Sequence, residues 1–135
     1  GVERPVGFGV TVNGVGTDKA HSARTAFAAS RMKEIAPLLA GLGAARIDTT
    51  GGGADIGPMM KRGVPGIAHE TVMEHYFDWH HTQADMLDKV DPVELRKNVA
   101  AMAVMIYLLA EMPATLLDGA PADGASGPKR VAKAP

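Results

Sequence analysis

Imidazole and carboxylate side chains crowd into one stretch of this 135-residue sequence. Four of the five histidines lie there: His69, His75, His80 and His81. The same stretch carries the carboxylates Glu70, Glu74, Asp78, Asp85, Asp88 and Asp91. Neutral imidazole and carboxylate are the ligands that zinc and similar ions prefer at catalytic sites. The residue types therefore allow a metal site, although their spacing matches no standard signature such as H-E-x-x-H.

Other chemistries find little support in the composition. The chain has no Cys, which excludes a disulfide framework and a thiol nucleophile. None of its serines lies in a Gly-x-Ser-x-Gly elbow. A formal net charge of -1 argues against a nucleic-acid surface. No apolar run is long enough to span a bilayer, so we expect no membrane span.

A run of three glycines at Gly51–Gly53 could suggest a nucleotide site, but Ile56 stands where the dinucleotide pattern needs its third Gly. The run instead indicates a tight turn at the end of a strand. Ligands bind at the carboxyl ends of strands in open α/β sheets, so Asp55 is expected at the rim of a site.

Strand and helix patterns alternate along the chain. Strands are predicted at 6–12, 46–50 and 64–68, and a short helix at 56–62. A helix is predicted from Thr17 or Asp18 to Gly41 or Gly43, kinked at Pro37. The polar, aromatic stretch 69–91 is predicted to be a long loop. In the last helix, Asp91 is the predicted N-cap, Pro113 stops the helix, and one apolar stripe is expected at Leu95, Val99, Met102, Ile106 and Leu109.

This order of elements predicts an α/β fold with a mostly parallel sheet. Three strands are few for a sheet covered on both faces, so a partner segment is expected elsewhere. The start at Gly1, without Met or a signal-peptide pattern, indicates a processed or partial chain. We predict one catalytic-domain part at 1–113 and a disordered Ala/Pro/Gly-rich tail at 114–135.

Four motifs carry a specific resemblance: GGADIGP at 52–58, GVPG at 63–66, YFDWHHT at 76–82 and LDKVDP at 87–92. With the following Asn98-Val99-Ala100, their order and spacing resemble the C-terminal region of the di-zinc exopeptidases that include carboxypeptidase Q and bacterial leucyl aminopeptidases. The resemblance covers most of residues 5–113. It implies a three-layer α/β/α sandwich, with two zinc ions at the carboxyl ends of the strands.

The resemblance also implies roles for single residues. The His directly before Thr, here His81, is the family's last metal ligand, and no residue of this chain matches the family's catalytic Glu. His80, Asp85 and Asp55 are candidates for groups around the metal centre. Asp85 could accept a hydrogen bond from the other ring nitrogen of His81, as carboxylates do for zinc-bound imidazoles.

The function implied is a zinc-dependent exopeptidase of aminopeptidase or dipeptidase type, which hydrolyses peptide bonds with a metal-bridged water. This chain is then the C-terminal part of the enzyme and is expected to be inactive without the missing N-terminal half. The expected partners are that N-terminal half and a peptide substrate. A homodimer is one further arrangement. Family inference suggests an exported protein, periplasmic or extracellular.

Two alternatives remain open. The chain could be a non-catalytic binding or scaffold domain that retains the peptidase fold. It could also be an independent metal-binding module that uses the whole cluster from His69 to His81. Substrate preference does not follow from the sequence.

Overall fold

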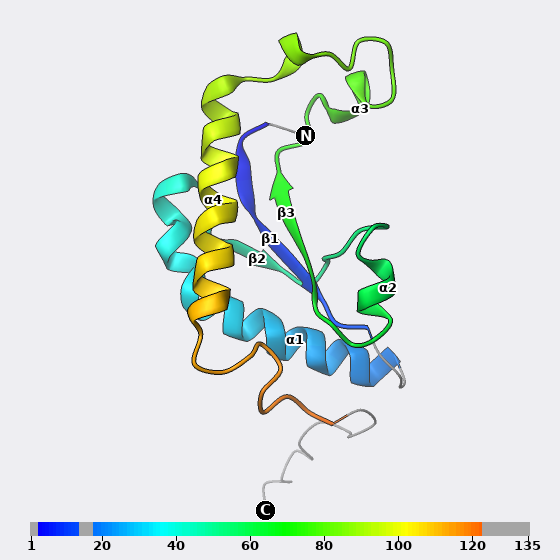
Figure 1. The fold of residues 1–135 in the computed structure, drawn as a ribbon, viewed down its shortest axis with the longest axis vertical. Coiled ribbons are helices and arrows are strands. Elements are labelled where there is room, and N and C mark those ends of the chain that lie inside the picture. The colour runs from blue at the N-terminus through cyan, green and yellow to red at the C-terminus, as the bar shows by residue number, and fades with distance from the viewer. Residues whose placement is uncertain (1–2, 14–17, 123–135) are drawn as a thin grey trace, which may run out of the picture.

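The computed structural model describes residues 3–13 and 18–122 (Figure 1). Nine elements follow one another in this order: β1 Pro5–Thr11, α1 Asp18–Ile35, η1 Ala36–Leu42, β2 Arg46–Asp48, α2 Gly57–Met60, β3 Gly66–Thr71, α3 Tyr76–Trp79, η2 Leu87–Lys89 and α4 Pro92–Glu111. The η elements are 3-10 helices. The mixed helix and strand content agrees with the predicted α/β class.

The three strands form one mixed sheet in the order β2-β1-β3. β1 runs parallel to β2, with Phe8 beside Ile47, and antiparallel to β3, with Phe8 beside His69. The prediction of a mostly parallel sheet is therefore wrong for the described residues. A parallel return needs a crossover of a dozen or more residues, usually a helix. The α1 helix lies in the crossover between the parallel strands β1 and β2, whereas residues 49–65, which join β2 to β3, hold only the four-residue α2 and lead to the other edge of β1.

The hydrophobic core lies where α1 and α4 meet one face of β1. Phe8, Val10 and Val12 present this face, since alternate residues of a strand point to the same side. The other members of the core are Ala28, Ala29, Met32, Leu39, Ala44, Ala101, Met105 and Leu116. Both long helices thus contribute to one core beside the sheet, and this arrangement by itself does not establish a three-layer sandwich.

Close backbone approach explains two glycines of the sheet region. A Cβ added at Gly9 would overlap the carbonyl oxygen of Thr50, and one at Gly51 would lie 2.6 Å from the carbonyl oxygen of Gly66. The hydroxyl of Thr11 accepts a hydrogen bond from the backbone N–H of Gly51 at 2.8 Å. The segment after β2 is therefore packed directly on the backbone of β1.

The first helix follows its sequence signals. α1 ends at Ile35, and the chain continues as the 3-10 helix η1 with Pro37 in its first turn. Gly43 closes η1 in the left-handed conformation, with φ of 74°. The predicted kink at Pro37 is confirmed as this change of helix type, because Pro cannot donate a hydrogen bond to the preceding turn. Thr17 lies outside the described residues.

β3 differs from its prediction. The strand spans Gly66–Thr71, so it starts after Pro65 and continues past the predicted end at residue 68. Its pairing with β1 continues up to the contact between Thr71 and Pro5. His69 and Glu70 therefore belong to a strand and not to the predicted loop.

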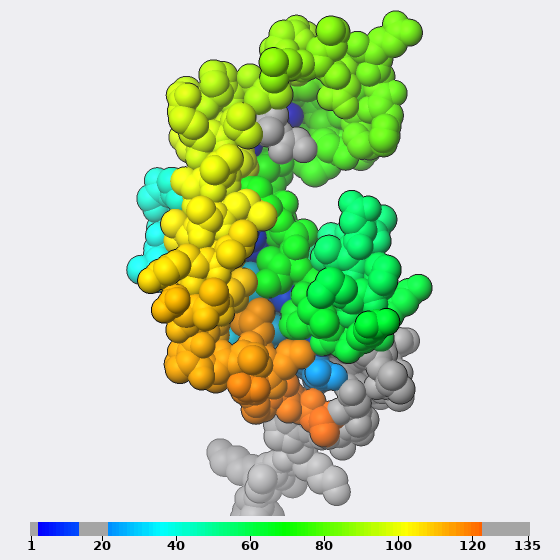
Figure 2. Space-filling view, viewed as in Figure 1, coloured from blue at the N-terminus to red at the C-terminus, as the bar shows by residue number. Residues whose placement is uncertain are grey.

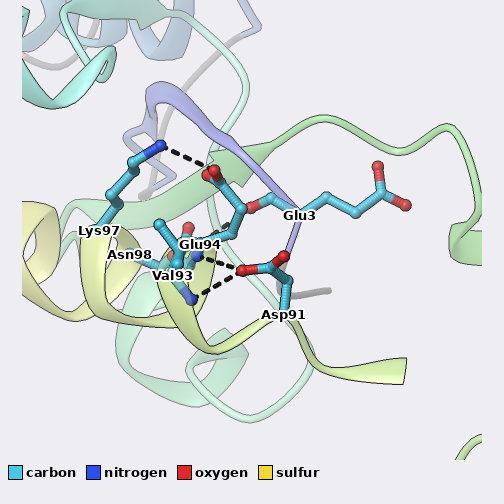
Figure 3. Close-up of polar contacts among 6 residues, drawn as sticks. All are labelled: Glu3, Asp91, Val93, Glu94, Lys97 and Asn98. Carbon is cyan, nitrogen blue, oxygen red and sulfur yellow. Dashed lines mark hydrogen bonds and ion pairs between the residues drawn. The ribbon is translucent and has the colours of Figure 1, made fainter. Parts of the chain in front are cut away.

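α4 begins as predicted at its cap. The Asp91 Oδ1 accepts hydrogen bonds from the backbone N–H groups of Val93 at 2.7 Å and Glu94 at 2.9 Å (Figure 3). The buried residues of the helix are Asn98, Ala101 and Met105. The predicted apolar stripe is instead largely exposed, at Leu95 39%, Val99 61%, Met102 39% and Ile106 59%.

The packed region continues beyond α4. Leu116 is 9% exposed and belongs to the core, and Leu117 packs against it. The packed part of the chain thus includes residues past the predicted boundary at 113. Most of the predicted tail, residues 123–135, lies outside the described residues. Within the described residues, no helix is long and apolar enough to cross a membrane.

Candidate functional site

The segment 72–91 joins β3 to α4 and contains α3 and η2 (Figure 1). It is held at its start by residues that precede β1. The Glu3 carboxylate accepts hydrogen bonds from the backbone N–H of Glu74 at 3.0 Å and of His75 at 2.8 Å. The backbone N–H of Val72 donates to the Arg4 carbonyl at 2.9 Å. Two parts of the chain far apart in sequence thus fix where this segment leaves the sheet.

His80 lies in an aromatic group formed by α3. Its ring stacks on Tyr76, with centroids 4.4 Å apart, and meets Phe77 edge-on at 6.5 Å. The Tyr76 hydroxyl lies 3.3 Å from the His80 Nε2. The centroid of the His81 ring, the next residue along the chain, lies 3.9 Å from the centroid of the His80 ring. His80 is therefore a partly buried ring packed between aromatic neighbours, and its place around a metal centre stays a prediction.

His81 has an unusual backbone. Its φ is 58°, and it is the one non-glycine residue with positive φ within the described ranges. His is several-fold enriched in this left-handed region relative to most residues, and such outliers cluster at functional sites. The turn that follows is closed by Thr82, whose N–H and hydroxyl both donate to the Trp79 carbonyl, at 2.9 Å and 2.7 Å. The result is an exposed imidazole on a fixed turn.

The other histidines of the cluster are engaged elsewhere. His75 Nδ1 lies 3.1 Å from the Asp78 Oδ2 and its ring stacks on Trp79 at 5.5 Å. This hydrogen bond raises the pKa of His75 above its usual 6.5. His69 lies on β3 with its ring 4.9 Å from Phe8. The histidines that are close together in the sequence thus lie on a strand, at a short helix and on a turn.

A metal ion needs three or four protein ligands in most zinc sites. In the part of the chain that the structure describes, no three His, Asp or Glu side chains come together in a group that could hold one. The exposed imidazole of His81 therefore has no group of further ligands around it within residues 3–13 and 18–122. This arrangement gives no support to the independent metal-binding module.

The two candidate carboxylates are both exposed. Asp55 lies in the turn before α2. Asp85 lines a cavity of about 190 Å³ together with Tyr76, Trp79 and His80. The hydrogen bonds of the described residues include none between Asp85 and His81, so the pairing expected from the sequence stays a prediction. Figure 2 shows the surface hollowed between the segment 72–90 and the region of α2.

Asn98 is the polar residue that sequence reasoning missed. It is 6% exposed, and its Nδ2 donates to the carbonyls of Glu3 at 2.8 Å and Glu94 at 2.7 Å (Figure 3). Its Oδ1 lies 2.5 Å from the His69 Nε2, which must carry the proton because an amide oxygen only accepts. Asn98 thus joins α4, β3 and the residues before β1. Its only sequence signal was its place in the family-like Asn-Val-Ala run.

Part of the chain is similar in sequence to carboxypeptidase Q. Carboxypeptidase Q of Mus musculus is 33% identical over 81 residues, which are 60% of this chain and 17% of that protein. Carboxypeptidase Q of Pongo abelii is also 33% identical, and that of Homo sapiens 32%, over the same extents. This chain contains a carboxypeptidase Q-like region. No protein-family model matches the chain, and no solved structure matches it significantly.

The carboxypeptidase Q-like region is partial. The chain covers only 17% of the length of the curated relatives that it matches. The larger part of each relative therefore has no counterpart in these 135 residues. The sequence similarity confirms the resemblance to carboxypeptidase Q. It does not extend to the activity of the complete protein.

Proposed function

We propose that this chain is the C-terminal part of a zinc-dependent exopeptidase and contributes His81 to a metal centre that polypeptide outside the chain completes. The observation that carries the proposal is the exposed His81 imidazole on a left-handed turn, in a chain with a carboxypeptidase Q-like region. A strained, outward-facing His is well placed to ligate a shared ion. Alone, it cannot hold one.

The chemistry expected of the complete centre is hydrolysis of a peptide bond at the end of a peptide substrate, of aminopeptidase or dipeptidase type. Zinc in such centres supplies a water of lowered pKa. The chain's own contribution is positional. Stacking of Tyr76 and His80 supports the His81 turn, and the Glu3 carboxylate fixes the start of the segment. Asp85 and Asp55 are proposed to lie around the completed centre.

The proposal also covers the fold of the complete domain and the location of the protein. The missing N-terminal half extends the three-stranded sheet into a three-layer α/β/α sandwich and brings the other ligands for two zinc ions. The chain by itself is then inactive. An exported location, periplasmic or extracellular, follows from the same likeness and is part of the proposal.

A non-catalytic binding or scaffold domain is the second candidate. One observation favours it: within the described ranges, no three potential ligands gather. The two candidates differ in what surrounds the chain in its natural gene. A preceding segment that carries His, Asp and a Glu-Glu pair supports the enzyme, and a natural gene without one supports the scaffold.

Metal content tests the role of His81. The natural gene product that contains this chain is purified, loaded with zinc and measured for bound metal beside its His81→Ala variant. The proposal expects this variant to lose zinc sharply. The matched controls His69→Ala and His75→Ala should keep it, whereas an independent cluster module requires them to lose as much. Equal zinc content in His81→Ala and the parent protein, with the fold intact by circular dichroism, contradicts the proposal.

A further inference from the structure

We propose that a cavity in the segment 72–91 binds a free α-amino acid, with Asp85 holding the ammonium group of the ligand and Lys89 its carboxylate. The segment lies beyond the end of β3 and carries α3 and η2 (Figure 1). The cavity has a volume of about 190 Å³. Pockets for drug-sized ligands are larger, at about 300 Å³ or more. This cavity therefore suits a molecule as small as an amino acid.

Much of the cavity wall is aromatic or apolar, with Tyr76, Trp79, His80, Met86 and Val90. The Tyr76 and His80 rings stack on one another with centroids 4.4 Å apart, and the Trp79 ring stacks on His75 at 5.5 Å. Rings that are already held by neighbours lose less conformational freedom when a ligand binds. The wall thus offers a preorganised surface for the side chain of an amino acid.

Asp85 gives the cavity a carboxylate that has no partner. Within the described ranges, no hydrogen bond or ion pair engages this side chain. Glu3 also lines the cavity, but its two oxygens already accept the backbone N–H groups of His75 at 2.8 Å and Glu74 at 3.0 Å. Hydrogen bonds between an ammonium group and a carboxylate are stronger than those between neutral groups. An ammonium ligand is therefore expected at Asp85.

Lys89 gives the same cavity a positive charge. Its Nζ donates to the Asp88 Oδ2 at 2.6 Å, and its side chain is 34% exposed. A lysine ammonium has three donor hydrogens, so two remain for the carboxylate of a ligand. An α-amino acid carries both charges on one carbon, and opposite charges on one small wall are complementary to it.

The inference goes beyond the proposed metal centre. His81 is not among the residues that line the cavity, and amino-acid binding there requires no zinc. Free amino acids are also what an exopeptidase releases, so in a complete exopeptidase the cavity would hold a product. Because Asp85 is proposed to lie around the metal centre as well, binding is measured in the presence of a chelator. Failure of either test then leaves the other proposal intact.

Trp79 is the only tryptophan of the sequence, so its fluorescence reports directly on the cavity. The 135-residue chain is titrated with L-norleucine. We expect a saturable change with a dissociation constant on the order of 1 mM. Pentylamine lacks the carboxylate of norleucine, and hexanoate lacks its ammonium group. Each should bind at least about fivefold more weakly, because one charged hydrogen bond is lost.

Two variants test the charged groups. Asp85→Asn and Lys89→Met should each raise the dissociation constant of norleucine at least about fivefold. Glu111→Gln is the matched control and should leave it unchanged, because the exposed Glu111 lies at the end of α4, outside the cavity wall. Circular dichroism checks that all three variants are folded.

Three outcomes overturn the proposal. The first is the absence of a saturable change at concentrations about tenfold above the expected dissociation constant. The second is binding of pentylamine or hexanoate as tight as that of norleucine, which would mark a site for an amine, a carboxylate or an apolar chain alone. The third is unchanged norleucine binding in either the Asp85→Asn or the Lys89→Met variant.

Discussion

The rings of His80 and His81 lie 3.9 Å apart, yet the two residues have opposite surroundings. His80 is packed on Tyr76, whereas His81 is exposed on a left-handed turn. Two identical side chains that are adjacent in the sequence thus differ in burial, since one is packed and the other is exposed. The adjacent positions make a matched pair for mutation, because the same residue type is removed from a packed and from an exposed place.

Gly9 provides a test of the close approach in the sheet. Gly9→Ala should lower the free energy of unfolding by more than about 3 kcal/mol, because its Cβ would overlap the Thr50 carbonyl and force the backbone apart. Gly53→Ala is the control, since a Cβ there meets nothing within 4 Å. Urea denaturation of both variants measures the difference. Similar stabilities for the two would show that β1 and Thr50 are not packed as described.

Asn98 provides a test of the buried polar network. Asn98→Leu should cost about 3 kcal/mol of unfolding free energy, because the His69 N–H and the Glu3 carbonyl lose their buried partner. Val93→Ala on the same helix should change it by no more than about 0.5 kcal/mol, as Val93 is half exposed. Thermal and urea unfolding measure both. A neutral Asn98→Leu would mean that water, and not Asn98, satisfies those groups.

Asp91 predicts a pH dependence of the α4 cap. Hydrogen bonds from the Glu94 and Val93 N–H groups lower the pKa of Asp91 below its usual 3.8. A lowered folded-state pKa means stabilisation that is present above the unfolded value and is lost as pH falls through the folded one. Asp91→Ala should therefore lower the melting temperature at neutral pH. The difference in melting temperature between this variant and the parent protein should become smaller below about pH 4. If the difference in melting temperature does not change with pH, the Asp91 carboxylate does not cap α4 as described.

His75 predicts a titration of opposite sign. The hydrogen bond to Asp78 raises its pKa above 6.5. A raised folded-state pKa stabilises the protein fully below the unfolded value, and this contribution disappears as pH rises through the folded one. NMR titration should place the His75 pKa above 6.5, and Asp78→Asn should bring it back toward that value. If Asp78→Asn leaves the titration unchanged, the pair does not form in solution.

Local signals were enough for much of the fold. The predicted 6–12 strand, the change of helix at Pro37 and the Asp91 cap all depend on neighbouring residues, and the structure confirms them. The end of β3 depends on pairing with β1, which no local pattern records. The direction of β3 is likewise part of its antiparallel pairing with β1. Long-range backbone pairing therefore accounts for both errors.

The face of α4 shows a different limit. The helix is apolar on more than one side, so periodicity identified a stripe without saying whether the core covers it. The core instead takes small Ala101 and polar Asn98, because Asn98 finds its partners in Glu3 and His69. Sequence alone could not supply a contact between Glu3 and His75, which are 72 positions apart. His81 was singled out by its motif, whereas the contact of Glu3 that fixes the start of its segment joins residues distant in the sequence.

His81 is proposed to be one ligand of a metal centre that polypeptide outside this chain completes. The most direct test of this role is exopeptidase turnover by residues 1–135 with added zinc, measured on a panel of dipeptides and aminoacyl substrates. We expect no turnover above background from the folded chain alone, and turnover that depends on His81 when the preceding part of the natural gene product is present. Appreciable hydrolysis by the isolated chain, abolished by a chelator, would contradict it.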